Sequence, residues 1–311
     1  MHEALDLSVV IPVYRSAKML PELVSRLLTV LNQTGLAYEI VFVEDDGPDD
    51  SWAVLSRLQE THPDRIVAIQ LMRNYGQHNA IMCGLRQSKG KWVVTMDDDL
   101  QHPPEEIPRL LEAMKSGDYD LIYGKPVDKK HSRFRNLGSD MINWFYRTTF
   151  RIPVRLTSFR IMRRQLLESV FSYNLNFTFL DGLFAWNTRR IGEIGVDHHP
   201  RQEGRSGYNL FKLITLSLNL FTNFSLVPLQ FVSILGIASS LGGVLLSFYY
   251  LIQYLANRII VPGYASLMIA ILVLGGIQLL ALGILGEYLG RLHLNVNRKP
   301  QYTVRNVLNR K

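Results

Sequence analysis

The stretch Trp92-Val93-Val94-Thr95-Met96-Asp97-Asp98-Asp99-Leu100-Gln101 decides the fold and locates the candidate site. Its first half is apolar and β-branched, which favours a buried strand. Three adjacent aspartates cannot continue such a strand, because burying unpaired carboxylates is very costly. The strand is therefore expected to end here, with its acids at the edge of a sheet. In open α/β sheets, ligands bind at this carboxyl end of the strands.

The pair of acids Asp97 and Asp99 is a candidate metal site. Side chains alternate along a strand, so these two are expected on one side and Asp98 on the other. Two hard oxygen ligands suit Mg²⁺ or Mn²⁺, which then carries phosphate oxygens. An isolated acidic triplet is more often a solvated turn. The buried strand before it and the helix start at residues 103–106 favour the metal site.

Strands that alternate with helices surround this stretch. The expected strands cover residues 7–14, 38–43, 66–71, 92–96, 119–123 and 189–196. The expected helices cover residues 17–32, 51–60, 79–87, 104–115 and 134–150, and a further one begins near residue 164. This alternation indicates an α/β domain with a mainly parallel sheet.

Polar residues follow three successive strands of this domain. They are Asp45 and Asp46, then Arg73 and Asn74, then Asp97 and Asp99. Since parallel strands end at the same edge, these side chains are expected to form one pocket. No G-x-G-x-x-G follows the first strand and no G-x-x-x-x-G-K-[ST] occurs, which excludes the dinucleotide and P-loop fingerprints. The pattern predicts a nucleotide held by acids and a divalent metal.

The C-terminal third has a different composition. Residues 213–257 and 259–286 contain no Asp, Glu, Lys or Arg. A bilayer core of about 30 Å needs about 20 apolar helical residues, so we predict membrane spans at 227–255 and 264–285. A buried helix of a soluble protein is the alternative, but it rarely runs so long without a charge. Residues 208–225 carry apolar side chains at helical spacing, which predicts an amphipathic helix in the membrane interface.

Charge predicts the orientation of these spans. The net charge is +7, and residues 291–311 hold six basic residues and no acid. After a membrane span, a basic segment indicates the cytoplasmic side and anionic lipid headgroups rather than nucleic acid. The loop between the spans carries only Arg258. The predicted order is a cytoplasmic catalytic domain (1–207), an interfacial helix (208–225), a two-helix membrane region (226–290) and a basic cytoplasmic tail (291–311).

Two basic segments are candidates for binding phosphate. Arg135 lies in the basic stretch 125–150, and a guanidinium binds phosphate through a fork of donors. Residues 198–208 are rich in Gly, Arg and Ser, which predicts a mobile loop that contacts phosphate through Arg201. Adjacent His198 and His199 cannot easily face one metal ion, so a zinc site is disfavoured. The only cysteine is Cys83, which excludes an intramolecular disulfide.

These residues resemble the polyprenyl-phosphate glycosyltransferases of family 2, which have the GT-A fold. The likeness covers nearly the whole chain and rests on Arg73-Asn74-Tyr75-Gly76-Gln77-His78, on the run of residues 97–108, and on Gly286-Glu287-Tyr288-Leu289-Gly290-Arg291. It implies a GT-A sheet with helices on both faces. It also implies an inverting enzyme that moves a sugar from a nucleotide-diphosphate sugar, UDP- or GDP-linked, to a polyprenyl phosphate with Mg²⁺ or Mn²⁺. A homotetramer in the bacterial inner membrane, acting on undecaprenyl phosphate, is the implied setting.

The resemblance also implies roles for single residues. Asp45 and Asp46 match acids that hold base and ribose, and Ser158 and Arg160 match an element beside the sugar. The predicted nucleotide-sugar contacts are Pro12, Tyr14, Asp45, Asp46, Arg73, Asn74, Gly76, Asp97 and Asp98. The predicted metal ligands are Asp97, Asp99 and Gln101. The predicted catalytic residues are Asp99, Arg135, Ser158, Arg160 and Arg201.

Two positions depart from the family pattern. Arg155 stands where many members carry an Asp proposed as a base, and Gly207 replaces a Lys. A strong base is dispensable, because a phosphate monoester has a second pKa of about 6 and is already anionic near pH 7. Which sugar is transferred stays open.

Three other functions were weighed. A polysaccharide synthase of the same fold would carry Gln-x-x-Arg-Trp, which is absent. A membrane scaffold without catalysis would not need the intact acid pair. A transporter would need more polar residues within its spans.

Overall fold

The computed structural model describes residues 5–127, 154–173, 179–197, 199, 227–256, 263–297 and 300–309. The chain divides into two compact units, one of Met1–Gly207 with Lys299–Lys311 and one of Tyr208–Arg298. The predicted helices at 134–150 and 208–225 lie outside the described residues. Arg135 and Arg201 lie outside them too.

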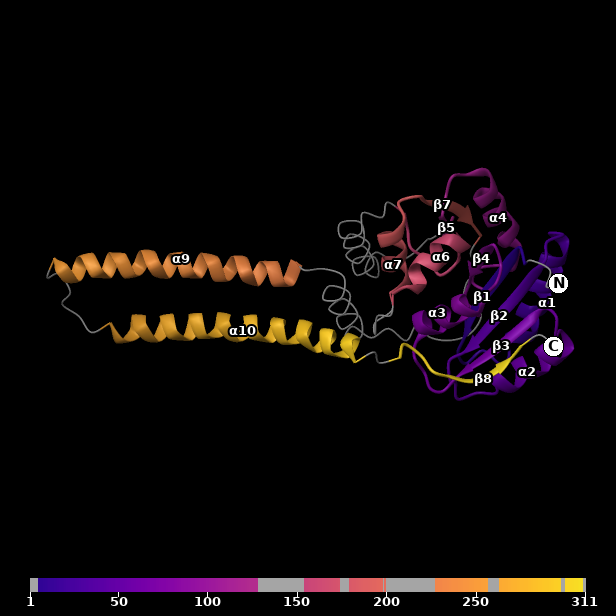
Figure 1. The fold of residues 1–311 in the computed structure, drawn as a ribbon, viewed down its shortest axis with the longest axis horizontal. Helices are drawn as coiled ribbons and strands as arrows, with labels where there is room; N and C mark the ends of the chain where they lie inside the picture. The colour runs from indigo at the N-terminus through magenta and orange to yellow at the C-terminus, as the bar shows by residue number, and fades with distance from the viewer. Residues whose placement is uncertain are drawn as a thin grey trace. The chain divides into compact units, whose positions relative to one another are not determined.

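One sheet of eight strands organises the described part of the first unit (Figure 1). Its strands are β1 (Leu7–Val13), β2 (Tyr38–Glu44), β3 (Ile66–Leu71), β4 (Trp92–Thr95), β5 (Leu121–Pro126), β6 (Arg160–Arg163), β7 (Ile191–Val196) and β8 (Val304–Leu308). They lie in the order β7-β5-β6-β4-β1-β2-β3-β8. The pairs β1–β2, β1–β4, β2–β3 and β5–β7 are parallel, whereas β6 and β8 run antiparallel to their neighbours. The predicted mainly parallel sheet is confirmed.

Helices cover both faces of this sheet. On one face α1 (Leu20–Gln33), α2 (Ser51–Thr61) and α4 (Ile107–Ser116) share a buried core with alternate residues of β1. On the other face α3 (Gln77–Gln87) packs against β1 and β2. Gly84 permits that close approach, because a Cβ there would collide with the Val10 side chain. This packing holds the start of α3 near the carboxyl ends of the central strands.

Short elements complete the described part of this unit. A 3₁₀ turn, η1 (Pro104–Glu106), precedes α4, and the helices α6 (Arg164–Phe171) and α7 (Leu180–Asn187) pack against each other. The helix start near residue 164 is confirmed. Strand β6 and helix α7 were not predicted, because β6 has four residues bounded by arginines and α7 has eight, too few to show a period.

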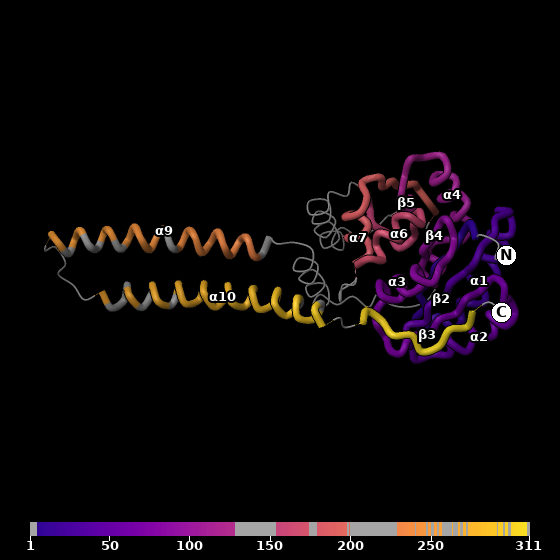
Figure 2. Tube along the Cα trace, viewed as in Figure 1, coloured from indigo at the N-terminus to yellow at the C-terminus, as the bar shows by residue number. Residues whose placement is uncertain are grey.

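The predicted basic tail is not one segment. Helix α10 continues through Val296, and Val304–Leu308 forms strand β8, which pairs with β3 at the edge of the sheet (Figure 2). Arg305 and Asn306 of β8 are exposed. Polar and charged side chains of this kind are common on edge strands, where they face water. The prediction missed this strand since it assigned the basic residues of 291–311 to lipid headgroups.

The second unit contains two long apolar helices, α9 (Val227–Leu255) and α10 (Tyr264–Val296), which lie side by side. Each holds a window apolar and long enough to cross a membrane, Leu229–Leu246 and Val273–Leu294, and none of either window is buried inside the protein. The predicted bounds of the first helix are confirmed. The second runs beyond the predicted Leu285, so the proposed boundary at residue 290 falls inside it.

Candidate functional site

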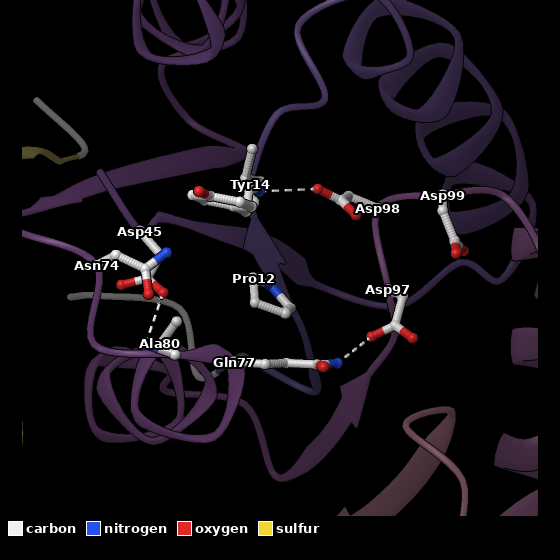
Figure 3. A pocket seen from close by; sticks show the side chains of 11 residues that line it. Pro12, Tyr14, Asp45, Asn74, Gln77, Ala80, Asp97, Asp98 and Asp99 are labelled. Atoms are coloured by element: carbon white, nitrogen blue, oxygen red, sulfur yellow. Dashed lines mark hydrogen bonds between the residues drawn. The ribbon is translucent and has the colours of Figure 1, made fainter. Parts of the chain in front are cut away.

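A cavity of about 250 Å³ lies where β1, β2 and β4 end (Figure 3). Four segments line it, with the residues Pro12, Val13, Tyr14, Asp45, Asn74, Gly76, Gln77, Ala80, Asp97, Asp98 and Asp99. Eight predicted site residues are therefore brought together from positions up to 87 residues apart, between Pro12 and Asp99. Three others, Asp46, Arg73 and Gln101, are not among the lining residues.

Asp45 fixes one wall of the cavity. Its Oδ1 accepts a hydrogen bond from the Tyr75 amide (2.7 Å) and its Oδ2 from the Gly76 amide (2.8 Å). Gly76 has a φ of +86°, which a residue with a side chain adopts only at a cost. Burial raises the pKa of Asp45 to about 6, and the two amides oppose the rise. Asp45 thus holds the loop that carries Asn74 in place.

The acids of the triplet have different partners. Asp97 accepts hydrogen bonds from Gln77 Nε2 and Ser158 Oγ, both at 2.6 Å. Asp98 accepts from the Tyr14 amide (3.1 Å) and from Ser16 Oγ, so it ties β4 to the end of β1. Burial raises the pKa of Asp98 to about 7, and the two donors oppose the rise.

Within the triplet, the side chain of Asp98 is turned away from that of Asp97 (Figure 3). All three carboxylates line one cavity, with Asp98 turned toward Tyr14 and Asp97 toward Gln77 (Figure 3). Strand β4 ends at Thr95, so all three acids follow the strand directly at its carboxyl end.

Asp97 and Asp99 fit a divalent cation that binds together with its substrate. No group of three or more His, Cys, Asp or Glu forms a metal cluster in the part of the chain that the structure describes. Mg²⁺ in nucleotide sites needs only one or two carboxylates, because water and phosphate supply the other oxygens. Gln101 contributes its backbone instead, donating its amide to Asp99 Oδ1 (3.2 Å) and accepting from the His199 amide (2.9 Å).

A second cavity of about 280 Å³ shares Gln77 and Asp97 with the first. Its other lining residues are His78, Ile81, Leu156, Thr157, Ser158, Arg160, Phe179 and Asp181. The predicted sugar-pocket residues Ser158 and Arg160 therefore lie beside the acid that borders both cavities. The two cavities therefore adjoin at Gln77 and Asp97.

A buried network shapes the second cavity. Arg160 forms an ion pair with Asp181 and donates from Nε to Thr95 Oγ1 (3.1 Å), while Thr95 donates to the Ser158 carbonyl (2.7 Å). Tyr123 also donates its hydroxyl to Asp181 (2.7 Å). Sequence reasoning missed Tyr123 and Asp181. One signal for Asp181 was available, because it is the only charged residue in the apolar run of residues 179–184. An acid in such a run is seldom buried without a partner, so the sequence could have predicted a buried ion pair there.

Asp46 and Arg73 are the sequence neighbours of the lining residues Asp45 and Asn74. Asp46 has a φ of +49° and is within 3.8 Å of the Arg305 guanidinium. The Arg73 guanidinium stacks on the Tyr75 ring at 4.8 Å from its centroid. Neither arrangement was expected from the sequence.

Comparison with known proteins identifies the class. Residues 8–171 match the family described as glycosyl transferase family 2, so the chain belongs to this family and is a glycosyltransferase. It is 37% identical over 305 residues to the undecaprenyl-phosphate 4-deoxy-4-formamido-L-arabinose transferase of Sodalis glossinidius, covering 97% of this chain and 93% of that protein. It is 35% identical to the protein of the same name from Pseudomonas aeruginosa, covering 97% and 90%.

Solved structures share the fold. Glucosyl-3-phosphoglycerate synthase from Mycobacterium tuberculosis, in complex with Mn²⁺, UDP and phosphoglyceric acid, aligns with a TM-score of 0.50 at 16% identity, covering 70% of this chain and 76% of that one. The predicted GT-A fold and the predicted enzyme class are confirmed.

Proposed function

We propose that this enzyme transfers a sugar from a UDP-sugar to undecaprenyl phosphate, with inversion at the anomeric carbon. The observation that carries the proposal is the pair of cavities joined at Asp97 and Gln77. The first would take the nucleotide, the second the sugar, and the diphosphate would lie at the junction. The names of the relatives support the lipid acceptor.

The nucleotide-sugar donor would be held by side chains that hydrogen bonds within the protein already keep in place. Asp45 holds the loop of Asn74, and Asp98 holds the end of β1 at Tyr14. Asp97 and Asp99 would hold Mg²⁺ or Mn²⁺, which neutralises charge on the leaving diphosphate. Ser158 and Arg160, fixed by Thr95 and Asp181, border the space for the sugar. Catalysis then rests on positioning and on charge stabilisation.

The acceptor needs little activation. A phosphate monoester is largely dianionic near pH 7, so its oxygen can attack the anomeric carbon without a strong base. A single in-line displacement inverts that carbon. We further propose that Arg135 and Arg201 contact the phosphates. Support for Arg201 comes from its neighbour in sequence, His199, whose amide is hydrogen-bonded to Gln101 beside the triplet.

The pairing of β8 supports a membrane arrangement with both ends of the helical region on one side. Strand β8 follows both apolar helices in sequence, yet it pairs with β3, which precedes them. Both strands therefore lie on the same side of any membrane, which requires an even number of crossings. We propose one crossing each for α9 and α10, with the catalytic unit in the cytoplasm near the lipid headgroups. A homo-oligomer remains a proposal from the family resemblance.

The experiment is a transfer assay with the purified full-length protein in lipid nanodiscs. UDP- and GDP-linked sugars are supplied with undecaprenyl phosphate and MnCl₂, and the lipid products are identified by mass. We expect a single sugar on the lipid with inverted anomeric configuration. Products with repeated sugars would instead favour a polysaccharide synthase. Absence of transfer from every donor would favour a membrane scaffold.

A further inference from the structure

Strand β8 contains an irregularity at the edge of the sheet. Gln70 of β3 pairs with Asn306, but the next residue, Leu71, pairs with Val304, so Arg305 is an extra residue without a counterpart. A β-bulge of this kind re-aims the side chain of the extra residue, and bulges are enriched beside active sites. The side chain of Arg305 is therefore free to serve a purpose other than strand pairing.

Arg305 reaches two segments that border the nucleotide cavity. Its Nη2 donates to the Met72 carbonyl at 2.8 Å, and its Nη1 lies 3.8 Å from Asp46 Oδ1. Met72 directly precedes the loop of Arg73 and Asn74, and Asp46 directly follows Asp45. One guanidinium thus connects the end of β2 with the segment that follows β3, and both segments carry residues that line the cavity.

Asp46 needs such a partner for two reasons. Its φ of +49° lies in the left-handed region, which costs free energy for a residue with a side chain. Its carboxylate also adds negative charge close to Asp45, where an anionic nucleotide would bind. The guanidinium at this point contacts the Asp46 carboxylate and offsets its charge.

Residues next to Arg305 attach β8 to β3, so Arg305 is not needed for that attachment. Asn306 donates to Gln70 Oε1 at 2.9 Å, and the Thr303 carbonyl accepts from the Met72 amide at 2.9 Å. These bonds hold the strand to β3 without reaching Asp46. Arg305 and Asn306 are both exposed, so neither substitution is expected to prevent folding.

We infer that Arg305 is a positioning residue of the nucleotide site, which acts on the donor through Asp46 and the Met72 carbonyl. The inference rests on the proposed function. The two side chains are 45% and 39% exposed, so the ion pair alone contributes little, and the hydrogen bond to Met72 adds to it. We expect an effect on donor binding of roughly fivefold.

The test measures UDP binding to the full-length protein in detergent with MnCl₂ by isothermal titration calorimetry. Arg305→Ala should weaken binding roughly fivefold, Arg305→Lys should fall between this variant and the wild type, and Asn306→Ala should bind like the wild type. In the transfer assay Arg305→Ala should raise the donor KM and leave kcat and the acceptor KM unchanged.

Two results would overturn the inference while leaving the proposed function intact. One is Arg305→Ala that binds UDP as the wild type does. The other is Asn306→Ala that loses as much affinity as Arg305→Ala, because attachment of the strand would then explain the loss. A wild-type protein that binds neither UDP nor GDP would overturn the proposed function, and this inference with it.

Discussion

The two joined cavities are built in different ways. In the first, backbone amides hold two of the acids: Tyr75 and Gly76 donate to Asp45, and Tyr14 donates to Asp98. In the second, side chains hold one another, and Arg160, Asp181 and Tyr123 come from β6, α7 and β5. The first depends on strand ends and tight loops. The second depends on an ion pair that is almost completely withdrawn from water. The two should therefore fail in different ways when single residues are changed.

The largest expected effect lies in the second cavity. Asp181→Ala leaves the buried Arg160 guanidinium without its partner, and breaking a buried ion pair in this way costs about 3–5 kcal/mol. Thermal and denaturant unfolding of the full-length protein in detergent would measure the loss. The control is Asp118→Ala, which removes an exposed partner of Arg190 and should leave the unfolding midpoint close to that of the wild type. Equal losses for both variants would refute the assigned role of Asp181.

In the first cavity the corresponding change should affect activity rather than folding. Asp99→Asn should keep its fold but lose at least about a hundredfold of turnover, roughly 3 kcal/mol of transition-state stabilisation. EDTA should abolish transfer by the wild type. Asp64→Asn, an exposed acid away from the cavity, is the matched control. Near-normal transfer by Asp99→Asn, or by the wild type in EDTA, would disprove the metal site.

The buried Asp45 predicts a pH dependence of stability. Its pKa is raised by burial from 3.8 to about 6, so the folded state binds the proton more tightly than the unfolded state. Stability from this group is therefore fully present below about pH 4, falls as the pH rises toward 6, and stays low above it. The expected change is on the order of 2–3 kcal/mol.

Unfolding of the metal-free protein at pH 4 to 7 measures this change. Asp45→Asn removes the titrating group, so the difference in stability between variant and wild type should shift across this window. A difference that stays constant with pH would show that Asp45 does not titrate as described.

The smallest expected effect concerns the hydrogen bond from Tyr123 to Asp181 in the second cavity. Tyr123→Phe removes one hydrogen bond to Asp181 but leaves the ion pair with Arg160 intact. The free energy of unfolding should fall by about 1 kcal/mol. A loss as large as that of Asp181→Ala would mean that the hydroxyl, rather than the ion pair, holds the network together.

The same contrast explains what could be predicted from the sequence. The acids of the first cavity follow apolar strands directly, so local pattern and the parallel topology together place Asp45 and Asp97 at one edge. Tyr123 and Asp181 are 58 residues apart, and no local sequence pattern predicts that their side chains are in contact. The bulge at Arg305 depends on the pairing register of β3 and β8, which are far apart in sequence. The hydrophobic periodicity of either segment does not predict that register.

Strand β8 also sets an order of events during synthesis. Arg305 and Met72 are 233 residues apart, which at 5–20 residues per second separates their translation by roughly 10 to 50 s. Until then, the free edge of β3 can pair with other chains, as unprotected edge strands do. Both apolar helices are translated within this interval. Arg305 therefore reaches Met72 and Asp46 only after the ribosome has produced both apolar helices, so a nascent chain stalled before β8 would lack these two contacts.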